Sequence, residues 1–202
     1  MKYAIKATIK NIIVAFLIVI AFFGLIYVFL GRKIELNISL INKIAVDTSS
    51  KKNEVMSIDL DTNKIQNYPE YGTQYATIEI PKINVDLPVY FGSTLDVLKN
   101  GVGHDSASFF PGEGGSIIYM GHNSQNVFRR FSELSKGDEI TIKAAYGEFK
   151  YKIYDMKLVD ETDLAALPIQ KDEEILMCYT CYPFNNIGYA TQRYVVYAKL
   201  EK

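Results

Sequence analysis

The most constraining feature of this sequence is a series of short strand-like segments that runs from Tyr75 to the C-terminus. Segments such as YATIEI, INVDLPVYF and QRYVVYAKL alternate apolar and polar residues, which is the period of a half-buried β-strand. Pro81 and the turn PGEGG separate them, and the stretches between them leave room only for brief helices. Short strands at this spacing predict a mostly β domain in the form of a closed or nearly closed barrel.

Two local patterns refine this prediction. In EFKYKIYDMKLV the apolar phase slips between Ile153 and Tyr154, which predicts a β-bulge. In SQNVFRRFSEL the residues Phe128, Phe131 and Leu134 fall on one helical stripe, and such a stripe indicates a segment that packs on the core.

A second feature stands before the barrel, where Ile12–Leu30 forms a run of nineteen residues without a charge. At a rise of about 1.5 Å per residue, a helix of this length covers roughly 28 Å, close to the hydrocarbon thickness of a bilayer. A cleaved signal peptide is the alternative, but its apolar region is usually about 7–15 residues long and ends at a small-residue cleavage site. This run closes on VFLG, so we expect an uncleaved transmembrane anchor over residues 12–30.

The charges around this run predict its orientation. Lys2, Lys6 and Lys10 precede it, whereas only Arg32 and Lys33 follow it closely. This small excess has the sign of an N-terminus that stays in the cytoplasm. We therefore expect a single-pass protein of the cell membrane whose folded domain is extracytoplasmic.

The expected organisation has four parts. Residues 1–11 form a short cytoplasmic N-terminus and residues 12–30 form the anchor. Residues 31–74, which include the polar stretch DTSSKKNE, form a stalk or linker with some short helix or a hairpin. Residues 75–202 form the barrel domain. The net charge of −1 gives no basic excess, so no nucleic-acid partner is expected.

The two cysteines, Cys178 and Cys181, stand in a Cys-x-x-Cys spacing that could serve redox chemistry, a metal or a single nucleophile. In a strand their side chains point to opposite faces with Cα atoms roughly 10 Å apart, beyond the limit of about 7 Å for a disulfide. The redox alternative stays open because Pro183 also suits the first turn of a helix. No second cysteine pair exists and the two histidines are not at finger spacing, so we expect neither a metal nor a cofactor.

Cys181 is the better nucleophile of the two, because it ends its strand and can reach a cleft, whereas Cys178 sits among apolar neighbours and resembles a small core residue. A nucleophilic thiol needs a base, and the chain has only two histidines. His122 ends a strand in Gly-His-Asn-Ser, a position suited to a site. His104 follows a short helix and is expected to be a hydrogen-bonded loop residue.

Arg193 stands at the start of the last strand, in ATQRYVVYAKL. It is either a solvated edge charge or, if this strand pairs beside the cysteine strand, a neighbour of Cys181. Arginine stays protonated and offers several donors, so in the second case it would stabilise an oxyanion in acyl transfer.

The motifs PGEGGSIIYMGH, YTCYPF and QRYVVYAK, in this order over Tyr75–Lys202, resemble the sortase family of membrane-anchored cysteine transpeptidases of Gram-positive bacteria. CYPFNNIGYATQRY is most similar to class D, although GHN also resembles class B. The resemblance implies a sortase-type barrel of eight strands with short helices. It also implies that Cys181 is the nucleophile, His122 the catalytic histidine, and Arg193 the arginine that steadies substrate and oxyanion.

Two positions before the nucleophile depart from the family. The family's Thr-Leu-x-Thr-Cys reads here as Met177-Cys178-Tyr179-Thr180-Cys181. Cys178 takes the place of the leucine, consistent with a buried apolar role, and Met177 in place of the threonine has no explanation in the sequence.

The implied activity is cleavage of a Leu-Pro-x-Thr-Gly/Ala-like sorting signal through a thioacyl-enzyme. The implied partners are surface-protein precursors that carry this signal and an amine of a peptidoglycan precursor as the acceptor. The expected substrate-binding residues are Thr180, Tyr182, Leu167 and Pro168. The last two belong to the long connection ETDLAALPIQKDEE, which forms either an apolar wall for the signal or an ordinary helix on the barrel.

Two other functions compete with this one. The first is a membrane-tethered thiol-disulfide oxidoreductase that uses Cys178 and Cys181 together. The second is a catalytically silent surface-binding barrel.

Overall fold

The computed structural model describes Phe16, residues 19–22, residues 56–59, Thr62, residues 64–184 and residues 189–201. The chain divides into two units, Met1–Ile38 and Ser39–Lys202, and each is described by itself. In the first unit, Phe16 and residues 19–22 are helical and exposed. No helix formed by the described residues is both long and apolar enough to cross a membrane. Most of the predicted anchor, and the predicted stalk up to residue 55, lie outside the described residues.

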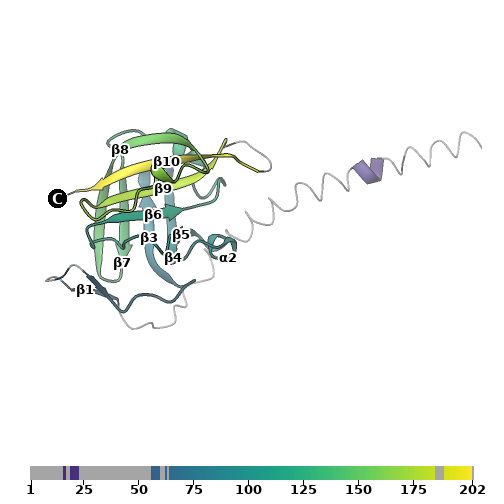
Figure 1. Ribbon diagram of the computed structural model, residues 1–202. Helices are drawn as coiled ribbons and strands as arrows, with labels where there is room; N and C mark the ends of the chain where they lie inside the picture. Colours follow the sequence, from purple (N-terminus) through teal and green to yellow (C-terminus); the bar gives the residue numbers. More distant parts are fainter. Residues whose placement is uncertain are drawn as a thin grey trace, which may run out of the picture. The chain divides into compact units, whose positions relative to one another are not determined.

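The second unit contains a closed barrel of eight strands, as the resemblance implied (Figure 1). Around the barrel the strands follow the order β10-β8-β7-β3-β4-β5-β6-β9, and β9 closes it by pairing with β10. Their bounds are β3 Gln74–Ile80, β4 Val85–Phe91, β5 Val102–His104, β6 Ser116–Met120, β7 Glu139–Ala144, β8 Gly147–Asp160, β9 Ile175–Tyr182 and β10 Gln192–Leu200.

Apolar residues of these strands fill the interior. Ile78 and Ile80 on β3, Ile140 and Ile142 on β7, and Ile153 on β8 are almost fully buried. Most neighbouring strands are antiparallel, but β4–β5 and β6–β9 are parallel. The β6–β9 pair determines which residues come together after these strands, because the carboxyl ends of two parallel strands meet at the same edge of a sheet.

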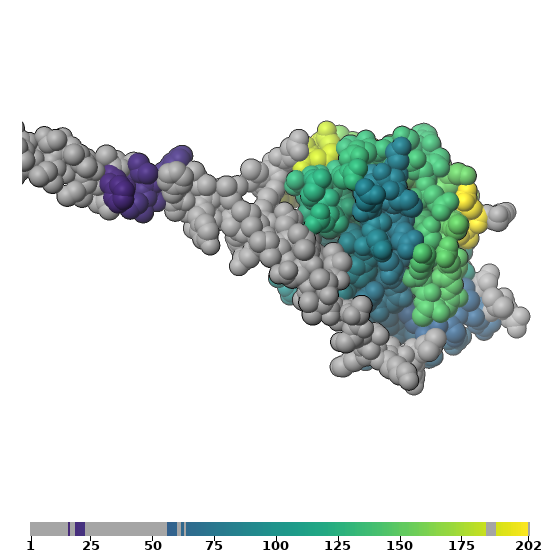
Figure 2. Space-filling model, turned by 180° about the vertical axis from the view of Figure 1, so that it is seen from behind, coloured from purple at the N-terminus to yellow at the C-terminus, as the bar shows by residue number. Residues whose placement is uncertain are grey.

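The helices are short, as expected: η1 Pro81–Ile83, α2 Leu95–Leu98, η2 Arg129–Glu133 and η3 Leu164–Ala166. The predicted core stripe is confirmed around η2, where Phe128 and Phe131 are fully buried and their rings stack with centroids 4.2 Å apart. The predicted bulge is also confirmed, because the β8–β10 register skips Tyr154. On the back of the barrel, β3 and β4 lie beside β7 and β8 as a blue surface bordered by green (Figure 2).

Part of the stretch predicted as stalk forms a small hairpin of β1 (Ser57–Asp59) and β2 (Lys64–Gln66). The buried carboxylate of Glu113 connects the segment that contains this hairpin to the barrel domain. Its Oε1 accepts hydrogen bonds from Ile65 N at 3.2 Å and Tyr68 OH at 2.7 Å, and its Oε2 accepts one from Phe110 N at 2.9 Å. The segment around Ile65 and Tyr68 is therefore part of the folded domain.

Candidate active site

Cys181 and Arg193 are direct partners in the antiparallel β9–β10 pair. Such partners have Cα atoms about 4.5–5.5 Å apart and side chains on the same face. Cys181 is half-buried and its thiol is free. The conditional prediction that the last strand pairs beside the cysteine strand is thus confirmed, and this pairing brings a thiol and a guanidinium to one face of the barrel.

His122 approaches the same place from β6. In the parallel β6–β9 pair Met120 is opposite Tyr179, and the next residue, Gly121, donates its N–H to Tyr179 O at 3.1 Å. Continuing this register by two residues leads His122 alongside Cys181. Burial lowers the pKa of the half-buried imidazole below its usual 6.5. Its Nε2 is buried and has no hydrogen-bond partner within the described residues.

Two side chains after His122 hold this loop against the cysteine segment. Asn123 Nδ2 donates to Pro183 O at 3.0 Å, which joins the residue after the histidine to the second residue after the nucleophile candidate. Arg129 in turn holds Asn123, with its Nη2 donating to the carbonyl oxygen at 3.3 Å and its Nε to Oδ1 at 3.5 Å. The loop that carries His122 is thereby fixed relative to the end of β9.

The guanidinium of Arg193 is held by hydrogen bonds to two backbone carbonyls and one carboxylate. Its Nη1 donates to Ala190 O at 2.7 Å and to Gln192 O at 3.0 Å, and its Nη2 donates to Glu161 Oε2 at 2.9 Å. The hydroxyl of Tyr189 donates to the other oxygen of Glu161. Arg193 is therefore an organised side chain, and the alternative of a solvated edge charge is wrong.

An apolar wall adjoins this site on the same face of β9 and β10. We define it by the cluster Ile118, Met177, Val195 and Tyr197, against which Val159, Leu167, Ile175 and Tyr179 pack. The long connection between β8 and β9 reaches the wall through Leu167, and Tyr197 OH donates to Ala166 O at 2.8 Å. Pro168 is exposed, and the short helix η3 buries none of its residues. This connection is consequently a loop edged by apolar residues rather than a helix packed on the barrel.

Thr180 and Tyr182 flank the cysteine on the other face of β9. Thr180 is almost fully buried, and its Oγ1 makes no hydrogen bond within the described part of the chain. Tyr182 is half-buried and forms an aromatic cluster with Phe184 and Tyr194, with ring centroids 5.3–6.5 Å apart.

The structure separates Cys178 and His104 from this site. Cys178 is fully buried, is a free thiol and has its pKa raised by burial, so the thiolate form is disfavoured there. His104 is fully buried, with Nδ1 2.9 Å from Tyr75 OH and Nε2 3.0 Å from Ser108 Oγ. Cys178 has the core role predicted for it. His104 is hydrogen-bonded as predicted, but the prediction that it lies in a loop is wrong, because it is the last residue of strand β5.

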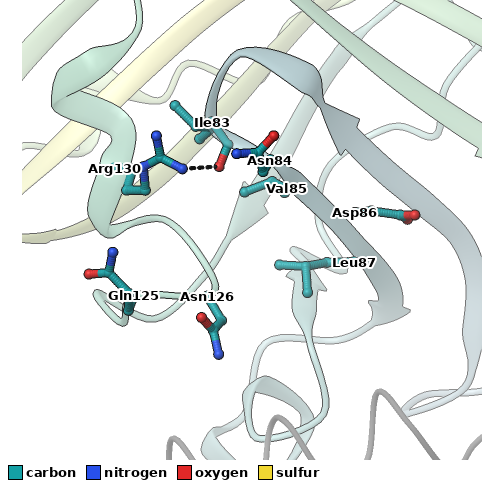
Figure 3. Close-up of a pocket in the computed structure, with 8 residues that line it drawn as sticks. All are labelled: Ile83, Asn84, Val85, Asp86, Leu87, Gln125, Asn126 and Arg130. Carbon is teal, nitrogen blue, oxygen red and sulfur yellow. Dashed lines mark hydrogen bonds between the residues drawn. The ribbon is translucent and has the colours of Figure 1, made fainter.

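A pocket of about 400 Å³ lies on another part of the domain (Figure 3). It is bounded by the η1–β4 segment, by Gln125 and Asn126 of the loop after His122, and by Arg130, which donates to Ile83 O at 2.9 Å. Neither Cys181 nor Arg193 lines it, so the site does not coincide with this pocket.

The sequence prediction missed Glu161 and Asn123. Both are polar residues next to predicted strand ends, but several neighbours share that property, and only the closed barrel shows which of them reaches the site.

Comparisons with known proteins agree with this geometry. A family model described as the sortase domain matches residues 78–201. The chain is 42% identical to sortase D of Bacillus subtilis (strain 168) over 153 residues, which covers 76% of this chain and 75% of that protein. A structure of a Clostridium perfringens sortase D5 transpeptidase superimposes with a TM-score of 0.61 at 35% identity, covering 67% of this chain and 83% of that one. Sortase C from C. perfringens SM101 superimposes with a TM-score of 0.59 at 28% identity, covering 69% of this chain and 77% of that one.

Proposed function

The chain belongs to the sortase family, and we propose that it works as a cysteine transpeptidase in which Cys181, His122 and Arg193 perform the chemistry. The observation that carries the proposal is the direct pairing of Cys181 with Arg193 across β9–β10, with His122 brought in by the parallel strand β6. The substrate is a surface-protein precursor with a Leu-Pro-x-Thr-Gly/Ala-like sorting signal, and the acceptor is an amine of a peptidoglycan precursor.

The first half-reaction forms a thioester. The imidazole of His122 takes the proton of the Cys181 thiol as Sγ attacks the carbonyl carbon of the signal's threonine. Negative charge develops on the carbonyl oxygen, and N–H donors of Arg193 stabilise it. The tetrahedral intermediate then expels the amine of the following residue, which receives the proton from His122. The products are a thioacyl-enzyme and the released C-terminal peptide.

The second half-reaction runs the same steps with a new amine. The acceptor amine attacks the thioester carbon, His122 takes its proton, and the Cys181 thiolate leaves and is reprotonated. One amide bond is broken and one is formed, so the exchange needs no oxidant, metal or cofactor.

The state of His122 fits this role. Burial lowers the pKa of the imidazole, so it is neutral near pH 7 and can accept a proton. Its buried Nε2 has no partner among the described groups, which leaves it available to a thiol or a substrate amine.

The wall around Leu167 supports the assignment of a signal-binding groove. It provides apolar contacts for a Leu-Pro segment on the face that carries Cys181. Pro168 borders this wall from its exposed position in the same loop. On the opposite face, Thr180 lies directly before the nucleophile, and Tyr182 stands with its aromatic neighbours where an acceptor would approach.

The proposal also places the protein at the cell membrane, with residues 1–11 in the cytoplasm and the catalytic domain outside. The uncharged run Ile12–Leu30 supports this placement, as do the exposed apolar side chains of Phe16, Val19, Ile20 and Phe22. Protease treatment of intact spheroplasts tests it: the domain should be digested, whereas a tag placed before Met1 should be protected.

The central experiment uses the full chain in detergent with quenched peptides that end in Leu-Pro-x-Thr-Gly or Leu-Pro-x-Thr-Ala. We expect cleavage, an acylated Cys181 detectable by mass spectrometry, and transfer of the acyl group to an added amine. Cys181→Ala should abolish cleavage, whereas Cys178→Ala should retain it.

Other outcomes separate the competing functions. Equal loss in both cysteine variants, together with a disulfide that forms and opens between them, would support the oxidoreductase. That function is disfavoured because Cys178 is buried and free on the opposite face of its strand. A chain that binds the peptides without turnover would support a silent binding module.

A further inference from the structure

Glu161 is the one carboxylate that bonds to the guanidinium of Arg193 within the described residues. The two charges are joined at 2.9 Å, and their side chains are only 19% and 23% exposed. Charged side chains at such low exposure are held by their partners rather than by water. Glu161 directly follows β8, which borders one edge of β10, whereas Cys181 belongs to β9, which borders the other edge.

The backbone of Glu161 is itself fixed. Its N–H donates to Thr191 O at 2.8 Å, which extends the β8–β10 ladder by one bond beyond the partners Asp160 and Gln192. The carboxylate of Asp160 accepts hydrogen bonds from Thr162 N at 2.9 Å and Thr162 Oγ1 at 2.6 Å, and this closes the turn that follows. The glutamate is therefore presented to Arg193 by an ordered turn.

The hydrogen bonds within the chain use only some of the N–H donors of the Arg193 guanidinium. Arginine has five N–H donors in a planar fork. Two bonds from Nη1 go to Ala190 O and Gln192 O, and one bond from Nη2 goes to Glu161. Among the described residues Nε–H and the second Nη2–H have no acceptor, so they remain for a ligand. A carboxylate that fixes the far side of the fork determines where these two donors point.

We infer that Glu161 is a positioning residue of the transpeptidase, which holds the Arg193 fork so that its remaining donors meet the oxyanion formed at Cys181. This inference rests on the proposed function. Glu161 touches no reacting atom and acts through Arg193. Without its carboxylate the guanidinium keeps its charge but loses its fixed orientation, and small misplacement of a stabilising group slows acyl transfer strongly.

The test uses the full chain in detergent and the variants Glu161→Gln, Glu161→Asp and Glu173→Gln. Glu173 is the matched control, since it is a glutamate at the other end of the β8–β9 connection, paired with Lys199 at 3.0 Å and half-exposed. We expect Glu161→Gln to lower kcat for signal-peptide cleavage on the order of 10- to 100-fold with little change in KM. Glu161→Asp should recover part of this loss, and Glu173→Gln should behave as the unmodified chain.

A second measurement separates positioning from a structural role. Alkylation of Cys181 by iodoacetamide forms no carbonyl oxyanion, so its rate should stay within about threefold in Glu161→Gln while cleavage falls. In an Arg193→Ala background, Glu161→Gln should have no further effect on cleavage, because a residue that acts through Arg193 cannot act without it.

Three results would overturn the inference: unchanged cleavage in Glu161→Gln, equal losses of cleavage and alkylation with a lowered Tm, or an undiminished effect in the Arg193→Ala background. A failure of the proposed function looks different, since in that case the unmodified chain does not cleave the peptides and equals Cys181→Ala.

Discussion

Arg193 faces Cys181 across the β9–β10 pair as its direct register partner, with the backbone ladder continuing on both sides of them. The relationship therefore depends on strand pairing rather than on the reach of two flexible side chains. A guanidinium in this position provides both positive charge near a thiolate and directed donors for an oxyanion. The two properties can be separated by substitution.

Arg193→Lys keeps the charge and removes the planar fork. We expect kcat/KM for signal-peptide cleavage to fall by about 10- to 100-fold in Arg193→Lys and by about 100- to 1,000-fold in Arg193→Ala. Lys199→Ala serves as the control, because Lys199 lies on the same strand and is half-exposed. A lysine variant with full activity would mean that charge alone is sufficient.

The pH dependence follows from the buried imidazole. The imidazole of His122 must be neutral to take the thiol proton, so activity is lost when His122 is protonated. Because burial lowers the pKa of His122, the acid limb of the kcat/KM profile should have its midpoint below pH 6.5. The cause is burial rather than the thiol, so His122 in Cys181→Ala should also titrate below 6.5 by NMR. A midpoint above 6.5 in either measurement would contradict this account.

Asn123 connects the histidine loop to the segment after the cysteine through its 3.0 Å bond to Pro183 O. Asn123→Ala should lower kcat/KM by about 3- to 30-fold, because the loop that carries His122 loses its fixed distance from the end of β9. Asn126→Ala, an exposed asparagine three residues further along, should have no such effect. Equal activity of the two variants would show that the backbone bonds of the loop are sufficient.

The strand pattern and the strand ends could be predicted from the sequence for physical reasons. A period of two shows which segments are strands, and Cys181, His122 and Arg193 all lie at or beside a strand end, where side chains leave the packed sheet. The adjacency of the last two strands followed from their order in the chain. The bulge at Tyr154 was visible as a break in alternation.

The interactions around these residues could not be predicted in the same way. Glu161 is one of five acidic residues in the connection ETDLAALPIQKDEE, and its contact with Arg193 exists only because β8 and β10 are neighbours in the closed barrel. The hairpin β1–β2 was expected only as an alternative to a short helix and could not be placed, because strands of three residues are too short to show alternation.

Glu113 provides a test of that hairpin. Glu113→Ala leaves the N–H groups of Ile65 and Phe110 and the hydroxyl of Tyr68 without their acceptor in a buried place. We expect the free energy of unfolding to fall by about 2–4 kcal/mol in urea denaturation. Glu133→Ala, which breaks only a solvent-exposed pair with Arg130, should lower the free energy of unfolding much less than Glu113→Ala.

The hydrogen bonds of Glu113 to Ile65 and Tyr68 also predict at which residue the stable domain begins. A chain that starts at Tyr75 lacks Ile65 and Tyr68, so Oε1 of Glu113 loses both hydrogen bonds. It should unfold at a lower urea concentration than a chain that starts before Met56. Equal midpoints would mean that the hairpin contributes nothing to stability.

His104 gives the stability a dependence on pH. The imidazole is surrounded by Tyr75, Phe91, Phe110 and Tyr119, with ring centroids 4.5–5.8 Å away. Burial lowers its pKa from 6.5 to about 3, so the folded protein keeps it neutral. The unfolded chain binds a proton below pH 6.5, where the folded state does not.

Stability contributed by neutral His104 is therefore complete above pH 6.5 and is lost progressively as the pH falls toward 3. At pH 5 this single group should remove about 2 kcal/mol from the free energy of unfolding. His104→Gln should be less stable at every pH, because it disturbs the bonds to Tyr75 and Ser108. Between pH 7.5 and 5, however, the free energy of unfolding of His104→Gln should fall by about 2 kcal/mol less than that of the unmodified chain. The carboxylates titrate in both proteins and cancel in the difference, so equal losses would show that His104 is protonated in the folded state.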